Sequence, residues 1–199
     1  MRKLALLALL FAMAWLFNGC TSVATSVASS GAQAIYNRQS ISKSATDQYI
    51  TMRSYQAIDI DSDHFRNANI NISTFNRVVL LSGQVPTADQ KIEAEQIVRK
   101  IAGSEQIYNL IKVDKPSTQL ARLQDAWITT KIKAKLLASN ELDSSQVKVV
   151  TENQTVFLMG ILRPSEARVA VNTASKTDGV HEVVKIFSYL NLSKTPAEG

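Results

Sequence analysis

The chain contains two copies of one sequence pattern, and this duplication restricts its fold more than any other feature. The first copy opens with Asp47–Thr51 and the second with Asp125–Thr129. Further landmarks recur in the same order and at nearly constant spacing. They are Val78–Gly83 with Thr155–Gly160, Gly103 with Gly179, and Ile107–Ile111 with Val183–Phe187. Self-similarity of this kind indicates one structural unit used twice.

Each copy has the pattern helix, strand, strand, helix, strand. In the second copy a helical stripe with a spacing of four residues comes first, formed by Ile128, Ile132 and Leu136. The strands Gln146–Thr151 and Thr155–Leu162 follow, with a hairpin turn at Asn153-Gln154. Pro164 suits the first position of a helix that is expected to run to Asp178 and to stop at Gly179.

The first copy carries its own boundary signals. Thr87 with Gln90 three residues later is a capping-box pattern, and Gly103 is expected to end that helix. Gly83 and Gly160 are expected to end the second strand of their copies.

The lengths of the connections predict the topology. Two strands joined by a tight turn are antiparallel, whereas two strands joined through a helix form a right-handed parallel crossover. The expected fold class is therefore α+β, with a three-stranded mixed sheet and two helices on one face in each copy. A domain this small is marginally stable alone, so we expect the two copies to pack against each other.

Composition places boundaries around the copies. Residues 21–45 are rich in Ser, Ala, Thr and Val and show no sustained amphipathic period, which favours a flexible tether. The expected segments are a signal peptide at 1–19, a tether at 20–45, domains at 46–114 and 122–192, a linker at 115–121 and a flexible tail at 193–199.

The N-terminus has the pattern of a secretory signal. Basic Arg2 and Lys3 precede the uncharged apolar run Leu4–Phe17, and small Gly19 stands before Cys20, the only cysteine in the chain. This arrangement resembles the bacterial lipobox, which implies that Cys20 is lipidated. Thr21, where aspartate causes inner-membrane retention, implies the outer-membrane class. The alternative is an ordinary secreted protein whose cysteine is unmodified.

The charge balance argues against a nucleic-acid partner. The net charge is +5, with 22 Lys and Arg against 17 Asp and Glu. Loss of residues 1–19 removes Arg2 and Lys3 and no acid, so the remainder carries about +3, which is only mildly basic.

The repeat resembles the BON domain. The residues that carry the resemblance are Trp127–Lys131, Val147–Val149, Thr151–Asn153 and Val156–Gly160, together with the paired glycines. Two such domains after a lipobox are similar to the dual-BON outer-membrane lipoproteins. The resemblance implies a phospholipid-binding module that supports outer-membrane integrity, in some cases at the division site. The implied partners are anionic phospholipids of the inner leaflet of the outer membrane and outer-membrane assembly or division proteins.

The resemblance places the lipid site on the first helix of the second domain, and the helical wheel gives that site a physical basis. Trp127 and Leu137 lie away from the core stripe on a second, weaker apolar face, and this face is flanked by Lys131, Lys133 and Lys135. An indole beside lysines suits an anionic membrane interface. The alternative places Trp127 in the core or between the copies, with the lysines on a solvated face. Tyr49 takes the matching place in the first copy, where only Arg53 follows, so that copy is the poorer lipid site.

The sequence offers no catalytic set. His64 and His181 are the only histidines and fall in different copies. The acids around His64 lack the glycine and the final glutamate of an EF-hand, so a polar turn is the better interpretation. We expect a non-catalytic binding protein with no cofactor and no metal. The rival hypothesis is a periplasmic scaffold that binds an envelope protein through the same surface, with Trp127 as a protein hot spot.

Overall fold

The computed structural model describes residues 31–60, 63–102 and 106–190. The predicted signal peptide, Cys20, Gly103 and the tail at 193–199 lie outside the described residues. The first repeat consists of α2 (Gly31–Ile60), β1 (Asn69–Phe75), β2 (Val78–Val85), α3 (Ala88–Ala102), β3 (Gln106–Asn109) and β4 (Lys112–Val113). The second consists of α4 (Gln119–Leu137), the 3-10 turn η2 (Ser144–Gln146), β5 (Val147–Glu152), β6 (Thr155–Leu162), α5 (Pro164–Ser175) and β7 (Glu182–Tyr189).

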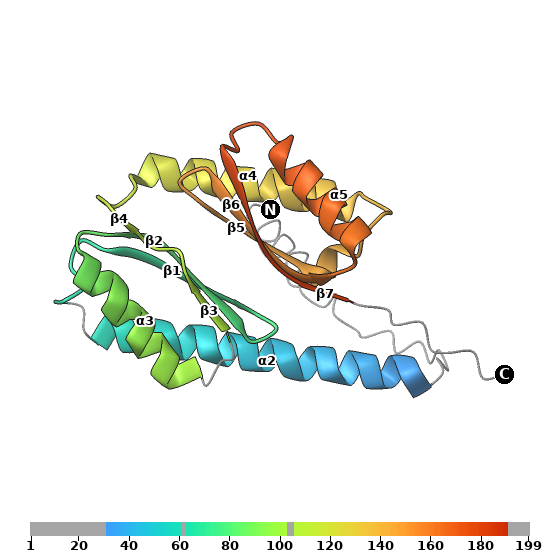
Figure 1. Ribbon diagram of the computed structural model, residues 1–199, viewed down its shortest axis with the longest axis horizontal. Helices are drawn as coiled ribbons and strands as arrows, with labels where there is room; N and C mark the ends of the chain where they lie inside the picture. The colour runs from blue at the N-terminus through green and yellow to red at the C-terminus, as the bar shows by residue number, and fades with distance from the viewer. Residues whose placement is uncertain (1–30, 61–62, 103–105, 191–199) are drawn as a thin grey trace, which may run out of the picture. The chain divides into compact units, whose positions relative to one another are not determined.

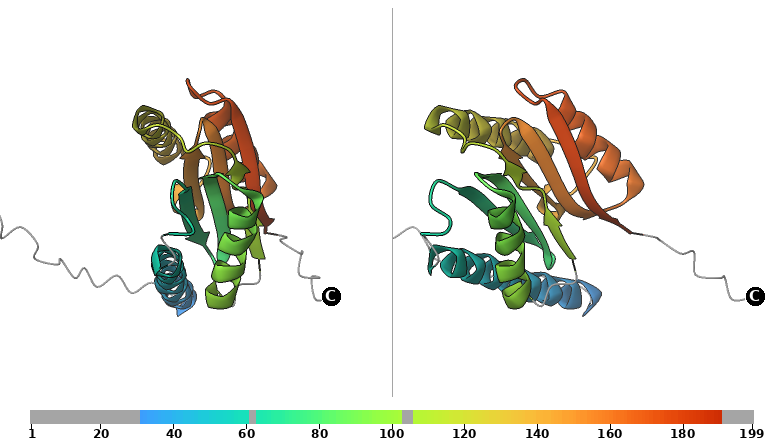
Figure 2. Two further views of the ribbon diagram at one scale, coloured as in Figure 1. Left: turned by 90° about the vertical axis from the view of Figure 1, so that its left-hand side faces the viewer. Right: turned by 60° about the vertical axis from the view of Figure 1, so that its left-hand side comes forward.

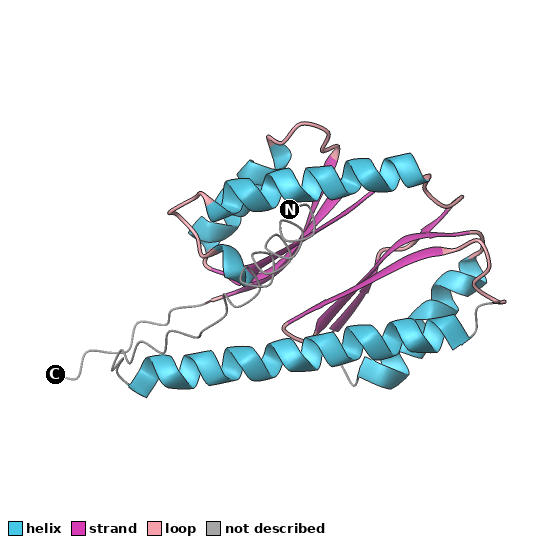
Figure 3. Ribbon diagram, turned by 180° about the vertical axis from the view of Figure 1, so that it is seen from behind, coloured by secondary structure: helices cyan, strands magenta, loops and turns pink. Residues whose placement is uncertain are grey.

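The two sheets have the predicted mixed topology. In the second repeat β5 pairs antiparallel with β6, and β6 pairs parallel with β7. In the first repeat β1 pairs antiparallel with β2, and β2 pairs parallel with β3 and β4. Two helices cover one face of each sheet, α2 and α3 in the first repeat and α4 and α5 in the second (Figures 1, 2 and 3).

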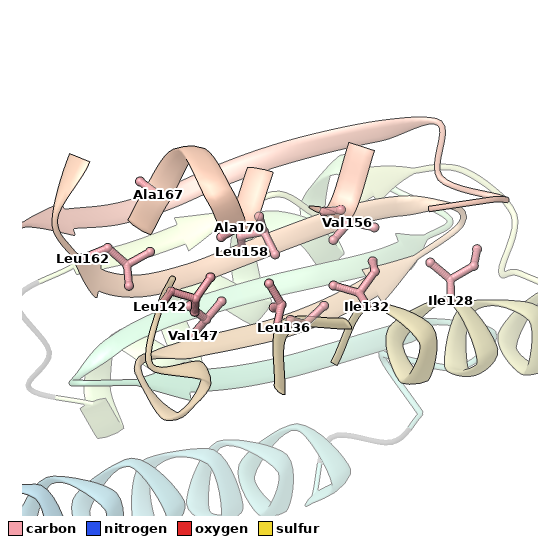
Figure 4. Close-up of a cluster of buried hydrophobic side chains, with 12 residues drawn as sticks. Ile128, Ile132, Leu136, Leu142, Val147, Val156, Leu158, Leu162, Ala167 and Ala170 are labelled. Carbon is pink, nitrogen blue, oxygen red and sulfur yellow. The ribbon is translucent and has the colours of Figure 1, made fainter. Parts of the chain in front are cut away.

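Each repeat has its own apolar core between its helices and its sheet. In the second repeat Ile128, Ile132 and Leu136 project from α4 toward Val156 and Leu158 on β6 (Figure 4). In the first repeat Ile50 and Ile58 of α2 hold the corresponding places, and buried Ser54 stands where the second repeat has Ile132. The four-residue spacing read from the sequence is therefore the core stripe.

One aspartate fixes the hairpin turn in each repeat. Asp125, buried in the second turn of α4, accepts hydrogen bonds from the backbone N–H groups of Asn153 and Gln154 at 2.7 and 2.8 Å. Both turn residues have positive φ, the left-handed backbone conformation that the two central residues of a tight hairpin turn adopt. Asp47 makes the same pair of bonds to Asn76 and Arg77 at 2.6 and 2.7 Å. The aspartates that open the repeats thus join the first helix to the first hairpin.

Several element boundaries differ from the sequence expectation. The helix α2 begins at Gly31, inside the segment predicted to be a tether, because this proline-free stretch extends the helix that contains Asp47. The helix α5 ends at Ser175 rather than Asp178, and Gly179 lies in the following turn with φ +94°. A Cβ at Gly179 would lie 3.1 Å from the Ile128 side chain.

The strands also differ in detail. Both β2 and β6 continue two residues past Gly83 and Gly160, so these glycines lie within strands and do not end them. At Gly83, φ is +109° and a Cβ would lie 1.9 Å from the carbonyl oxygen of Asn69 on β1. The glycine is needed for close approach of the paired strand. The last strand of the first repeat is split into β3 and β4.

The two repeats contact each other through the sheet faces that their helices leave open. Fully buried Leu80 of β2 belongs to one apolar cluster with four buried residues of the second repeat, namely Val150, Phe157, Met159 and Ile186. Polar contacts border this cluster. Lys148 donates to the carbonyl oxygen of Thr74 at 3.1 Å, and burial lowers the pKa of this lysine. The expected packing between copies is present in the structure.

Glu152 of β5 is the centre of a polar cluster between the repeats. Its Oε1 accepts hydrogen bonds from Asn69 at 2.9 Å and from Gln84 at 3.0 Å, and Ser117 lies at 3.5 Å. Burial raises the pKa of Glu152, and the hydrogen bond from Gln84 opposes that rise. The carboxylate joins both repeats and the connection between them.

Candidate lipid-binding surface

The helix α4 is longer than the sequence predicted. It begins at Gln119, and Thr118 caps it by accepting a hydrogen bond from the N–H of Ala121 at 3.2 Å. Its first turn therefore lies within the predicted linker 115–121. At a rise of about 1.5 Å per residue, the helix is about 28 Å long.

The outer side of α4 carries a continuous apolar stripe. Trp127 is 64% exposed and Leu137 is 76% exposed, so neither belongs to the core. Leu120 and Leu123, at 66% and 68%, extend the stripe through the first turns. At about 100° per residue these four side chains and Ala134 fall within a sector of about 100°. The stripe points away from the core residues of the same helix. We call these five residues the α4 stripe.

The charges that reach solvent from α4 are all basic. The helix has five charged residues, and the one acid, Asp125, is buried and bonded to the hairpin turn. The four others lie beside the α4 stripe. They are Arg122 and Lys133 on one side and Lys131 and Lys135 on the other. An apolar stripe between two rows of cations is the pattern of a helix that lies in a membrane interface.

Of the three predicted lysines, two are held by hydrogen bonds and one extends into solvent. Lys131 donates to the carbonyl oxygen of Asp178 at 2.6 Å, and Lys135 donates to the Thr177 hydroxyl at 3.0 Å. These two bonds tie α4 to the turn after α5 and orient the ammonium groups, each of which keeps further donor protons. Lys133 is exposed, and no hydrogen bond or ion pair of its ammonium occurs within the described part of the chain.

The sequence pattern did not predict that Leu120, Leu123 and Arg122 belong to this surface. The stretch containing Pro116, Ser117 and Thr118 has the composition of a linker, and the helix was therefore expected to begin later. The sequence does contain a signal for the earlier helix start. Thr118 is a good N-cap residue, and Leu120 and Leu123 follow it at a helical spacing that continues to Trp127.

The matching helix of the first repeat presents a different surface. Tyr49 lies at the position of Trp127 and is also exposed, together with Met52. In the described stretch that follows, Arg53 is the only basic residue, and its guanidinium donates to Gln56 at 3.3 Å. Tyr55 is held at the sheet, where its hydroxyl accepts from the N–H of Ile72 at 2.8 Å. Between Ser44 and Asp59 this helix lacks the paired basic rows of α4.

The other candidate positions have local structural roles. His64 lies in the turn before β1, where its Nε2 is 2.8 Å from a Glu93 carboxylate oxygen and its ring meets Phe65 edge to face. His181 lies before β7, and its N–H donates to the carbonyl oxygen of Gln154. Within the described residues no group of three or more His, Cys, Asp or Glu could hold a metal. No helix in that part of the chain is long and apolar enough to span a bilayer.

The chain matches one protein family profile and several known bacterial proteins. The BON domain family profile matches residues 46–115 and 124–191. The outer membrane lipoprotein DolP of Haemophilus influenzae is 30% identical over 186 residues, which cover 93% of this chain and 96% of that protein. The 21 kDa hemolysin of Actinobacillus pleuropneumoniae is 36% identical over 72% of this chain and 74% of its own length. The osmotically-inducible protein Y of Escherichia coli is 31% identical over 69% of each chain.

The family follows from these matches together with the structure. Two matched copies cover most of the chain, each has the helix-strand-strand-helix-strand order, and a relative of nearly the same extent carries the DolP name. The chain therefore belongs to the BON-domain family, as a dual-BON protein of the DolP type.

Proposed function

We propose that this protein is a non-catalytic lipoprotein of the bacterial envelope whose second BON domain docks on anionic phospholipid through α4. Lipidated Cys20 anchors it in the outer membrane, facing the periplasm, where it supports outer-membrane integrity. The observation that carries the proposal is the α4 stripe with basic residues on both sides. The outer-membrane lipoprotein relative supports the location.

The physical basis is the match between α4 and a headgroup layer. The indole of Trp127 suits the interface, and Leu120, Leu123 and Leu137 supply apolar surface to the acyl boundary. Each basic residue near an anionic surface contributes about 1 kcal/mol. Because Asp125 is buried in a structural contact, no exposed acid on α4 opposes this attraction.

Co-sedimentation with lipid vesicles tests the proposal. The chain lacking residues 1–20 should bind vesicles that contain phosphatidylglycerol and should bind poorly to vesicles of phosphatidylcholine alone. Trp127→Glu should abolish binding at an unchanged thermal midpoint, because Trp127 lies outside the core. Tyr49→Glu, the matched position of the first repeat, should leave binding intact.

The scaffold hypothesis predicts a different result. If the chain fails to bind anionic vesicles and Trp127→Glu instead disrupts a complex with an envelope protein, the stripe is a protein hot spot. If Trp127→Glu folds and binds vesicles like the parent, lipid docking does not use α4.

A further inference from the structure

The second repeat has a groove on the edge of the molecule that lies apart from the α4 stripe. It runs between α5 and β7, with a volume of about 640 Å³. Its apolar lining includes Pro164, Ala167, Val171 and Tyr189, and its basic lining is Arg168 and Lys185. Within the described residues neither Arg168 nor Lys185 has an ion pair or a side-chain hydrogen bond.

The strand beside this groove has an open edge. β7 pairs with β6 on one side, and no described strand pairs with it on the other. Figure 1 shows β7 as the outer strand of its sheet, with α5 beside it. The strand is eight residues long, and Lys185 is the only charge in its interior. Unpaired edges of this length are normally shortened, bulged or covered in proteins, because they pair with other chains.

The matching place in the first repeat is built differently. There the last strand is divided into β3 and β4, of four and two residues, so the edge is interrupted. Asn109, which matches Lys185, donates from its side-chain amide to the carbonyl oxygen of Lys91 and to the Glu95 carboxylate at 3.1 Å. These contacts join the strand to α3.

Comparison of the repeats identifies what the open groove lacks. In the first repeat Glu95 supplies a carboxylate that accepts hydrogen bonds from Asn109 and Arg99. In the second repeat Val171 stands at the position of Glu95 and Lys185 at that of Asn109, so the carboxylate is absent and a cation takes the place of the amide. Arg168, at the position of Ile92, adds a second cation. An extended segment that places one carboxylate beside Arg168 and Lys185 would supply the missing charge, and its backbone would pair with the open edge.

We propose that the α5–β7 groove binds an extended acidic segment of another protein by strand addition to β7. The backbone of that segment continues the sheet beyond β7. Alternate side chains enter the groove, and an aspartate or glutamate contacts Arg168 and Lys185. A lipid headgroup would satisfy the cations but would leave the open strand edge unpaired, so the edge favours a peptide. This inference is independent of the function proposed for α4.

A displayed library of random linear decapeptides, selected on the full chain in detergent micelles, tests the proposal. Enriched peptides should carry Asp or Glu among alternating apolar residues. A synthetic copy of one enriched peptide should bind at least about tenfold more weakly to Arg168→Glu and to Lys185→Glu. Lys176→Glu, an exposed charge reversal just after α5 and outside the groove, should bind like the parent.

Two further measurements separate strand addition from simple charge attraction. Methylation of alternate backbone nitrogens in the peptide should abolish binding, and the bound peptide should protect β7 amides from hydrogen exchange. The proposal is overturned if no acidic peptide is enriched, if the selected peptide binds Lys185→Glu like the parent, or if backbone methylation has no effect. It is also overturned if Lys185→Glu folds normally and loses binding to anionic vesicles instead, because the groove is then a lipid site.

Discussion

Single residues connect elements in this fold that are far apart in the sequence. Asp125 is the main example, because its two carboxylate oxygens accept hydrogen bonds from adjacent N–H groups of a left-handed turn. A second duplicated contact lies beside it. The hydroxyls of Thr129 and Thr151 meet at 2.7 Å, and those of Thr51 and Thr74 meet at 2.9 Å. The sequence showed that these residues recur but not that they contact the hairpin.

Replacing the aspartate should destabilise each repeat. Asp125→Ala removes two hydrogen bonds to a charged acceptor and should lower the free energy of unfolding by about 3 kcal/mol. Asp47→Ala should have a similar effect in the first repeat, since its geometry is the same. Urea denaturation measures both. A loss below about 0.5 kcal/mol in either variant would contradict the role assigned to these aspartates.

The buried Glu152 should make stability depend on pH. Because burial raises its pKa in the folded state, the folded protein binds a proton at this site more tightly than the unfolded chain does. The free energy of unfolding therefore falls as pH rises from the ordinary glutamate pKa through the raised value. Glu152→Gln keeps an acceptor oxygen and removes the charge, so it should be more stable than the parent at pH 7. The difference should vanish below about pH 4.

Glu95 is a control whose effect on stability should depend on pH in the opposite direction. The hydrogen bond from Arg99 is the largest cause that lowers the pKa of Glu95. The stabilisation that this carboxylate contributes is present at neutral pH and is lost as pH falls through the lowered value. Glu95→Gln should therefore be slightly less stable than the parent at pH 7. Thermal midpoints from pH 3.5 to 8 check both variants, and an equal effect at all pH values would contradict the assignment.

At the scale of elements, the apolar period and the turn chemistry predicted most of what is observed. Thr87 and Gln90 form the expected reciprocal cap, and Pro164 opens α5. The failures have local causes. Thr118 starts a helix directly after a segment with linker composition, and α5 gives way to a turn in which the N–H of Thr177 donates to the carbonyl oxygen of Ala174. Where β3 gives way to β4, the Asn109 side chain accepts a hydrogen bond from the N–H of Ile111 at 3.3 Å and donates to the Lys91 carbonyl oxygen of α3, and the contact with α3 cannot be read from the local sequence.

The α4 stripe makes a prediction about a residue that the sequence did not reveal. Leu123 lies one turn before Trp127 on the same exposed face, so Leu123→Glu should weaken binding to anionic vesicles by about tenfold or more at an unchanged thermal midpoint. Ile92→Glu, at another exposed apolar site on α3, serves as the matched control and should bind like the parent. Equal loss in both variants would show that added negative charge acts at long range and that the stripe is not the contact.

At the scale of the whole molecule, the two repeats share a buried apolar surface, which explains why neither sheet needs helices on both faces. The duplication predicted that such a surface was needed, because each small sheet has one uncovered face. It did not identify Leu80, Phe157 and Met159 as the residues that meet, since the apolar residues of β2 and β6 are buried or half-buried on both faces.

Leu80→Ala tests this shared surface. The side chain is fully buried in the cluster between the repeats, and its loss should cost about 2–5 kcal/mol. Unfolding of the two repeats should also separate into two transitions. Leu120→Ala, on the exposed stripe, should change stability by no more than about 0.5 kcal/mol. Differential scanning calorimetry distinguishes the outcomes, and an effect of Leu80→Ala as small as that of Leu120→Ala would contradict the packing.

The most direct test of lipid docking uses the protein's own fluorescence. The chain contains two tryptophans, Trp15 and Trp127, so a fragment lacking residues 1–20 reports on Trp127 alone. Vesicles containing phosphatidylglycerol with brominated acyl chains should shift the emission to shorter wavelength and quench it, because the indole enters the interface. Binding to these vesicles with unchanged, unquenched emission would contradict docking through α4.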